Sequence, residues 1–217
     1  MKGKFFLLFY LALCCFMAKA PATEVLSIAA FSKSGLEGWQ EKLFTGKTTY
    51  RLVQSGNHTV LKAESRDSAS SLIKKIRVDL ERYPYLNWKW RIEKRLATGN
   101  ETKKTGDDYA ARIYVVIDGG MMAWRTRAVN YVWANRASKG EVWANAFAGK
   151  DSMIMALRSS ESKTATWYTE KRDVYKDIRR LFGKEVRFVD AIAIMTDTDN
   201  SHGQVESCYG DIYFSSE

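Results

Sequence analysis

Short segments in which apolar and polar residues alternate constrain the fold of this chain more than any other feature. Between Tyr85 and Glu93, the side chains of Trp88, Trp90 and Ile92 fall on one side of an extended chain, and the polar residues between them fall on the other. A period of two residues is typical of a β-strand with one buried face. The segment 109–117 repeats this pattern, so it is predicted to be a second such strand.

Similar segments recur along the chain, separated by glycine and polar clusters, and they predict a mostly β protein. One helix is expected at 174–182, because Asp173 is a suitable N-cap and Gly183 is placed to end it. About eleven strands and one helix imply an antiparallel two-sheet β-sandwich of jelly-roll type. Further strands are predicted at 25–31, 48–54, 59–65, 71–78, 128–134, 153–158, 164–169, 186–195 and 207–214, with a short one at 142–144.

The N-terminus has the pattern of a secretory signal peptide, predicted to span residues 1–22. Lys2 and Lys4 precede an apolar run at 5–17, and small residues follow, with cleavage expected after Ala22. This run is shorter than the roughly twenty residues that a membrane-spanning helix needs. Residues 23–217 are therefore expected to form one periplasmic domain with no transmembrane segment. A lipid anchor at Cys14 is the alternative, although Leu13 is larger than the residue that lipoprotein signals place there.

Charge and cysteine content narrow the classes of partner. Removal of three leader lysines leaves 34 − 3 = 31 basic residues against 25 acidic ones, a net charge of +6. These charges are interleaved rather than clustered, which disfavours nucleic acid as a partner. Only Cys208 remains in the mature chain, so no internal disulfide can form and stability must come from a packed core.

The most informative polar group is Asp107, Asp108 and Arg112, at a predicted junction between a loop and a strand. One interpretation is a carboxylate–arginine bridge that fixes the start of the strand. The other is a ligand site in which Arg112 and Tyr114 share a face and bind an anionic or hydroxylated molecule. For this second interpretation the candidate ligand residues are Asp108, Arg112, Tyr114 and Trp124.

A second acidic group follows the strand predicted at 186–195. Asp197 and Asp199 supply carboxylate oxygens of the kind that calcium prefers, and Asp211 is a third candidate ligand. The segment does not match an EF-hand loop, because His202 occupies the position of the required glycine. A structural calcium is one interpretation, and a turn stabilised by local hydrogen bonds is the other.

Aromatic residues suggest where a sugar could stack. Trp88 and Trp90 are expected in the core, whereas Trp124, Trp143 and Trp167 fall in or near loops or on less regular strands and are better candidates for an exposed platform. No catalytic residue is assigned, because neither of the two histidines has a nucleophile motif beside it. Carboxylate-based hydrolysis or a lyase reaction leaves little local signature and stays open as an alternative.

Several motifs together resemble one bacterial exported family. They are Trp88-Lys89-Trp90, the run at 106–112, Asn130-Tyr131-Val132-Trp133, the run at 194–200 and the closing segment at 209–214. The chain resembles the family called domain of unknown function 3047, which implies no activity. Gly38-Trp39 and the closing segment are also similar to jelly rolls of the galactose-binding and carbohydrate-binding-module type, which implies a sugar-binding face or a structural calcium.

The resulting functional expectation is a non-catalytic exported protein that binds a carbohydrate-like or anionic polar ligand of the cell envelope. Two alternatives remain. The first is an enzyme acting on an envelope polysaccharide, with Asp107 or Asp108 as acid or base and Arg112 neutralising a uronate. The second is a scaffold or assembly protein of the envelope that contacts another protein. The oligomeric state is not predicted.

Overall fold

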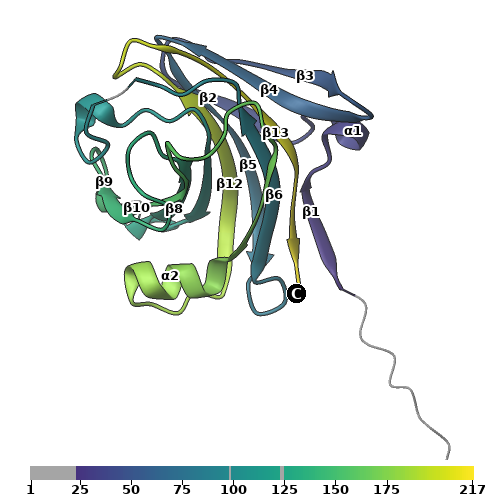
Figure 1. Ribbon diagram of the computed structural model, residues 1–217. Helices are drawn as coiled ribbons and strands as arrows, with labels where there is room; N and C mark the ends of the chain where they lie inside the picture. The colour runs from purple at the N-terminus through teal and green to yellow at the C-terminus, as the bar shows by residue number, and fades with distance from the viewer. Residues whose placement is uncertain (1–22, 98, 123–124) are drawn as a thin grey trace, which may run out of the picture.

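The computed structural model describes residues 23–97, 99–122 and 125–217, and within these ranges it is a two-sheet β-sandwich (Figure 1). The expected fold class is therefore confirmed. The signal peptide predicted at 1–22 lies outside the described residues and stays a prediction.

One sheet has six strands. Five follow the order β11-β6-β13-β4-β3, and β1 pairs with β13 beside this path. The C-terminal strand β13 pairs with β1, β4 and β6 from the first half of the chain, whereas β3 and β4 are consecutive and form a hairpin. Their bounds are β1 Val25–Ala29, β3 Thr49–Ser55, β4 His58–Arg66, β6 Tyr85–Ile92, β11 Tyr168–Asp173 and β13 Gln204–Ser215.

The second sheet has seven strands in the order β2-β5-β12-β7-β8-β10-β9. All its pairs are antiparallel except β8 with β10, which is parallel. The sequence predicts a purely antiparallel sandwich. After β8 the chain first forms β9 at the edge of the sheet, and β10 then inserts between β9 and β8, antiparallel to β9 and parallel to β8. The strands are β2 Trp39–Thr45, β5 Ala69–Asp79, β7 Arg112–Ile117, β8 Arg127–Trp133, β9 Val142–Asn145, β10 Gly149–Arg158 and β12 Phe188–Asp197.

The core lies between the sheets and is built from the alternating residues that the sequence predicts. Trp88, Trp90 and Ile92 are fully buried there, and the Trp88 and Trp90 rings meet edge to face with centroids 5.4 Å apart. Ile113 and Val115 of β7 are buried in the same cluster. Arg112, Tyr114 and Val116 alternate with them, so their side chains project from the opposite, outer face of the seven-stranded sheet.

The helix α2 spans Val174–Phe182, as expected. The Asp173 side chain accepts a hydrogen bond of 2.9 Å from the Lys176 backbone N–H, and Gly183 ends the helix in the left-handed conformation. Two shorter helical segments were not expected, α1 at Phe31–Ser34 and the 3₁₀ turn η1 at Lys104–Gly106. Phe31 thus leaves the predicted first strand, and its buried ring opens α1 instead.

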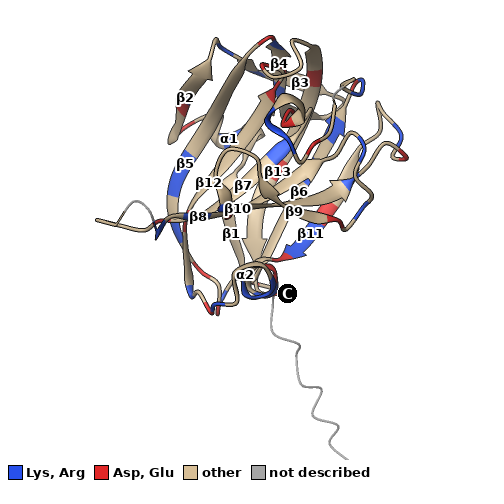
Figure 2. Cartoon of the chain, turned by 90° about the vertical axis from the view of Figure 1, so that its left-hand side faces the viewer, with Lys and Arg blue, Asp and Glu red and all other residues tan. Residues whose placement is uncertain are grey.

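Basic and acidic positions are interspersed along the strands and loops in the view of Figure 2. Ion pairs such as Lys62 with Glu206 and Arg77 with Asp190 link many of them. Within the described ranges, no helix combines the length and apolar character required to cross a membrane.

Candidate functional site

A cavity of about 490 Å³ opens on the outer face of the seven-stranded sheet. Its lining comes from β2, β5, β7 and β12, from β9, β10 and the turn between them, from the β12–β13 turn and from the segment that precedes β7. Side chains alternate between the two faces of a strand, so every second residue of β7 and β12 faces away from the core and toward this cavity. Among those residues are Arg112 and Tyr114 of β7, and Met195 and Asp197 of β12.

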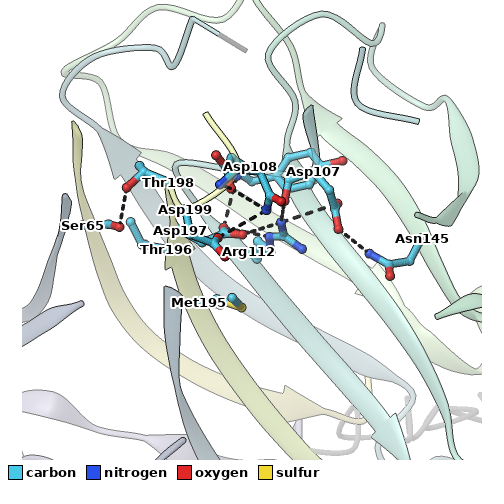
Figure 3. A network of polar contacts seen from close by, with 12 residues as sticks. Ser65, Asp107, Asp108, Arg112, Asn145, Met195, Thr196, Asp197, Thr198 and Asp199 are labelled. Atoms are coloured by element: carbon cyan, nitrogen blue, oxygen red, sulfur yellow. Dashed lines mark hydrogen bonds and ion pairs between the residues drawn. The ribbon is translucent and has the colours of Figure 1, made fainter. Parts of the chain in front are cut away.

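The centre of the cavity wall is a buried ion pair between Arg112 and Asp197. Arg112 Nε donates to Asp197 Oδ1 at 3.0 Å, and Nη2 donates to Oδ2 at 2.6 Å, so the pair is bidentate. Nη2 also donates to the Asp107 backbone carbonyl, and Nη1 donates to the Tyr114 hydroxyl at 3.0 Å. Figure 3 shows the contacts with Asp197 and Asp107 meeting at the guanidinium of Arg112. These four hydrogen bonds use four of the five guanidinium N–H groups.

Strand register brings the pair together. Arg112 is directly opposite Met195 in the β7–β12 ladder, and Asp197 lies two residues beyond Met195 on the same face. Tyr109 fixes the geometry further, because its backbone N–H donates to Asp197 Oδ1 at 3.1 Å and its ring lies 4.2 Å from the guanidinium carbon. Arg112 is only 2% exposed, so the guanidinium belongs to the frame of the cavity.

Asp108 holds the turn between β12 and β13. Its carboxylate accepts hydrogen bonds from the Ser201 backbone N–H at 2.6 Å and from the Asn200 backbone and side-chain nitrogens at 3.3 and 3.2 Å. The turn carries Asp199 and Asn200 into the cavity lining. Asp108 thus positions two polar residues of the site.

Asp107 contributes a second buried carboxylate to the lining. Its Oδ2 accepts a hydrogen bond of 2.8 Å from Asn145 Nδ2, visible in Figure 3. Asn145 Oδ1 in turn accepts from the backbone N–H groups of Phe147 and Ala148, at 3.0 and 2.8 Å. This chain of contacts fixes the β9–β10 turn, and with it the Phe147 ring, relative to the buried carboxylate.

Burial raises the pKa of each carboxyl group in the cavity lining. The pKa of Asp107 is raised by desolvation, and the positive charge of Arg112 opposes that shift. Desolvation also raises the pKa of Asp197, again against Arg112. The pKa of Asp199 is raised by partial burial, with repulsion from Asp108 as a further cause. Burial therefore disfavours the charged form of all three carboxyl groups, and the positive charge of Arg112 opposes this effect.

Two exposed phenylalanines stand at the rim. Phe44 on β2 is 56% exposed and Phe147 in the β9–β10 turn is 57% exposed, and both line the cavity. β2 and β9 are the two end strands of the seven-stranded sheet, so the rings border the cavity from opposite ends of the strand order. The Lys42 ammonium lies 5.1 Å from the centroid of the Phe44 ring, and the Lys104 ammonium lies 5.1 Å from the centroid of the Phe147 ring.

The carboxylates could be considered for a metal ion. Asp108, Asp197 and Asp199 offer oxygens within 4.8 Å of one another. However, both Asp197 oxygens already accept hydrogen bonds from Arg112, and both Asp108 oxygens accept from the β12–β13 turn. A divalent cation would have to replace these donors beside a guanidinium, so the residues present do not fit a calcium site.

The family model described as "Protein of unknown function (DUF3047)" matches residues 37–213. The chain belongs to the DUF3047 family. No curated protein matches it.

Solved structures with some similarity to this DUF3047 chain include two carbohydrate-binding modules and one enzyme domain. A family 30 module of a cellulosomal cellulase from Clostridium thermocellum has a TM-score of 0.46 at 12% identity, covering 83% of this chain and 92% of that one. A family 29 module has a TM-score of 0.43 at 12% identity, covering 90% of each. The Endo-D glycoside hydrolase domain of Streptococcus pneumoniae R6 has a TM-score of 0.40 at 8% identity, covering 82% of this chain and 22% of that one.

The structure brings some of the predicted site residues together and separates others. Arg112 and Tyr114 both line the cavity and are hydrogen-bonded to each other, whereas Asp108 is fully buried outside the lining and holds the β12–β13 turn. Trp124 lies outside the described residues. Asp211 is on β13 in the other sheet, where its carboxylate accepts a hydrogen bond of 2.9 Å from the Phe31 N–H, and it is not part of the acidic cluster.

The other predicted aromatic platforms lie away from this cavity. Trp143 lines a separate cavity of about 340 Å³ beside Glu101 and Arg136, and Trp167 lies near Lys89 and Arg91 of β6. Sequence reasoning missed Phe44 and Phe147 because it searched for tryptophan. No local signal marks Phe44, because β2 is exposed on both faces and carries no apolar stripe.

Proposed function

We propose that this DUF3047 protein binds a carbohydrate in the cavity of the seven-stranded sheet. The observation that carries the proposal is that two exposed phenyl rings, Phe44 and Phe147, line one cavity whose mostly apolar wall also carries several polar side chains. Sugars present apolar C–H faces and hydroxyl groups at once, so they match a site with aromatic rings and fixed hydrogen-bonding groups.

The polar groups of the lining suit hydroxyl recognition. Asn145 and Asn200 offer amide groups, Ser71 and Ser152 offer hydroxyls, and Asp199 offers acceptor oxygens. Asn145 is held by three hydrogen bonds of its own, which keeps its position fixed before a ligand binds. A preorganised wall reduces the entropy lost on binding.

An anionic ligand is disfavoured by the same geometry. Arg112 already spends four of its N–H groups on Asp197, Asp107 and Tyr114 and is buried, so it offers little to a uronate. The buried, largely engaged guanidinium therefore disfavours both the expected anionic ligand and a reaction in which Arg112 neutralises a uronate. The proposal is therefore binding of a neutral or cationic glycan, without turnover.

The setting we propose is the periplasm, on the strength of the signal peptide predicted at 1–22. An envelope glycan is then the accessible ligand class. The test is a glycan array on the purified protein, followed by analysis of each bound glycan for products. Retention without cleavage supports the proposal, and release of shorter products would replace it with a hydrolase or lyase.

Site-directed variants assign any binding to the cavity. Phe44→Ala and Phe147→Ala should each weaken binding about two- to tenfold, as expected for the loss of one stacking contact worth roughly 0.5–1.5 kcal/mol. Tyr213→Ala is the matched control, because this aromatic residue is 37% exposed on β13 of the other sheet. Equal losses in all three variants would place the ligand elsewhere.

A further inference from the structure

The charges that line the cavity do not balance. Asp107, Asp197 and Asp199 contribute three carboxylates, whereas Arg112 and Lys42 contribute two cations, so the formal sum is 2 − 3 = −1. Asp108 is outside the lining, but its carboxylate lies within 4.8 Å of those of Asp197 and Asp199 and adds a further carboxylate to this group. The chain as a whole has a formal charge of +9, so an acidic cavity is opposite in sign to the protein around it.

Asp199 is the accessible member of this group. It is partly exposed and lines the cavity, and its carboxylate accepts a long hydrogen bond of 3.3 Å from Asn200 Nδ2 and one from the Thr45 side chain. Across the part of the chain that the structure describes, no lysine, arginine or histidine lies within ion-pair distance of its carboxylate. A ligand entering the cavity therefore meets a carboxylate that has no protein cation of its own.

Asp107 is a second carboxylate of the lining with an acceptor oxygen that lacks a donor. It is 3% exposed and lines the cavity, and its Oδ1 accepts no hydrogen bond from any described residue. The Arg112 Nη2 atom is 3.5 Å from this oxygen, but that nitrogen is already committed to Asp197 and to the Asp107 carbonyl. Since a buried acceptor without a donor is costly, a positive charge nearby would stabilise this wall.

Among ligands that could supply positive charge, an amine fits better than a metal ion. The Asp108 and Asp197 oxygens are already hydrogen-bonded, which leaves a hard cation too few free ligands. An ammonium group needs only acceptors, carries three N–H donors, and can bind Asp199 without displacing Arg112.

We propose that the glycan bound in this cavity carries a free amino group, as in a de-N-acetylated hexosamine, and that its ammonium binds Asp199 between the Phe44 and Phe147 rings. This inference rests on the proposed carbohydrate function and deepens it. N-acetylation removes the charge from the same sugar, so the acetylated glycan is the matched ligand.

Isothermal titration of the protein with glucosamine hexamer, N-acetylglucosamine hexamer, a neutral glucan hexamer and spermine tests the inference. Glucosamine hexamer should bind at least about tenfold more tightly than its acetylated form, as a charged hydrogen bond in a partly buried site allows. The preference should shrink at high salt, because the ion pair is partly exposed.

The variant Asp199→Asn should reduce the ratio of the two affinities toward one. Glu161→Gln is the matched control, since it removes the same charge from an exposed position outside the cavity lining, and it should leave the ratio unchanged.

Equal binding of the amino, acetylated and neutral glycans would overturn the amine preference while leaving the carbohydrate function intact. Binding of spermine as tight as that of glucosamine hexamer would overturn recognition of an amino sugar. Failure of every glycan to bind would overturn the proposed function itself.

Discussion

Substitution of Arg112 by methionine should destabilise the fold, because it leaves Asp197 buried without its partner. Both side chains are 2% exposed and their ion pair is bidentate. Breaking a buried ion pair by removing one partner costs roughly 3–5 kcal/mol. In a domain of this size each kcal/mol corresponds to roughly 2–4 °C, so the melting temperature should fall by about 6–20 °C.

The assay is thermal unfolding followed by circular dichroism, with denaturant unfolding at a fixed temperature as the second measure. The double variant Arg112→Met with Asp197→Leu should recover much of the loss, because it removes both buried charges together. If Arg112→Met kept the wild-type melting temperature and lost only glycan binding, then Arg112 would be a ligand residue, and the assignment to the frame would be wrong.

Three further predictions concern ions, pH and the helix. Calcium or a chelator should leave the melting temperature unchanged, since the acidic oxygens are already hydrogen-bonded; a rise with calcium would show that the ion displaces those donors. A hydrogen bond to Asp67 raises the pKa of His202 in the folded protein. This ion pair therefore stabilises the fold fully below the unfolded pKa of about 6.5, and the stabilisation is lost as pH rises through the folded pKa. The difference in melting temperature between wild type and His202→Asn, which tolerates the φ of 51° there, should therefore decrease with pH, and a difference that grows with pH would contradict this. Asp173→Ala should cost about 1 kcal/mol in denaturant unfolding by removing the N-cap bond to Lys176, and an unchanged midpoint would refute the cap.

Local pattern was sufficient to predict much of the fold. Trp88, Trp90 and Ile92 lie in the core as their alternation requires, and the helix with its cap at Asp173 is where the sequence predicts it. These features depend on periods of two or 3.6 residues and on capping chemistry, which act over a few neighbouring residues.

Contacts between distant strands could not be predicted in the same way. Arg112 and Asp197 are 85 residues apart, and their pairing follows from the register of β7 against β12. Sequence reasoning offered Asp107 and Asp108 as partners of Arg112 because they are close in the chain, and it treated Asp197 as an ion ligand. The parallel pairing of β8 with β10 is likewise a consequence of how the chain crosses the sheet, which no local pattern encodes.

The exposure of the rim phenylalanines was also beyond local pattern. β2 was not predicted as a strand, because its residues are exposed on both faces and show no apolar stripe. Whether Phe44 is buried depends on what covers the edge of the sheet, and this is a property of the assembled fold.

The most direct test of the central claim is an NMR titration of the ¹⁵N-labelled protein with a bound glycan, which maps the contact surface residue by residue. Glycan binding in the cavity predicts the largest amide shift changes at Phe44, Ala148 and Asp199, around the lining of the seven-stranded sheet. Lys89 and Tyr213, on the other sheet, should stay unchanged. The opposite distribution, with changes at Lys89 and Tyr213 and none around the cavity, would contradict the assignment of this cavity as the glycan site.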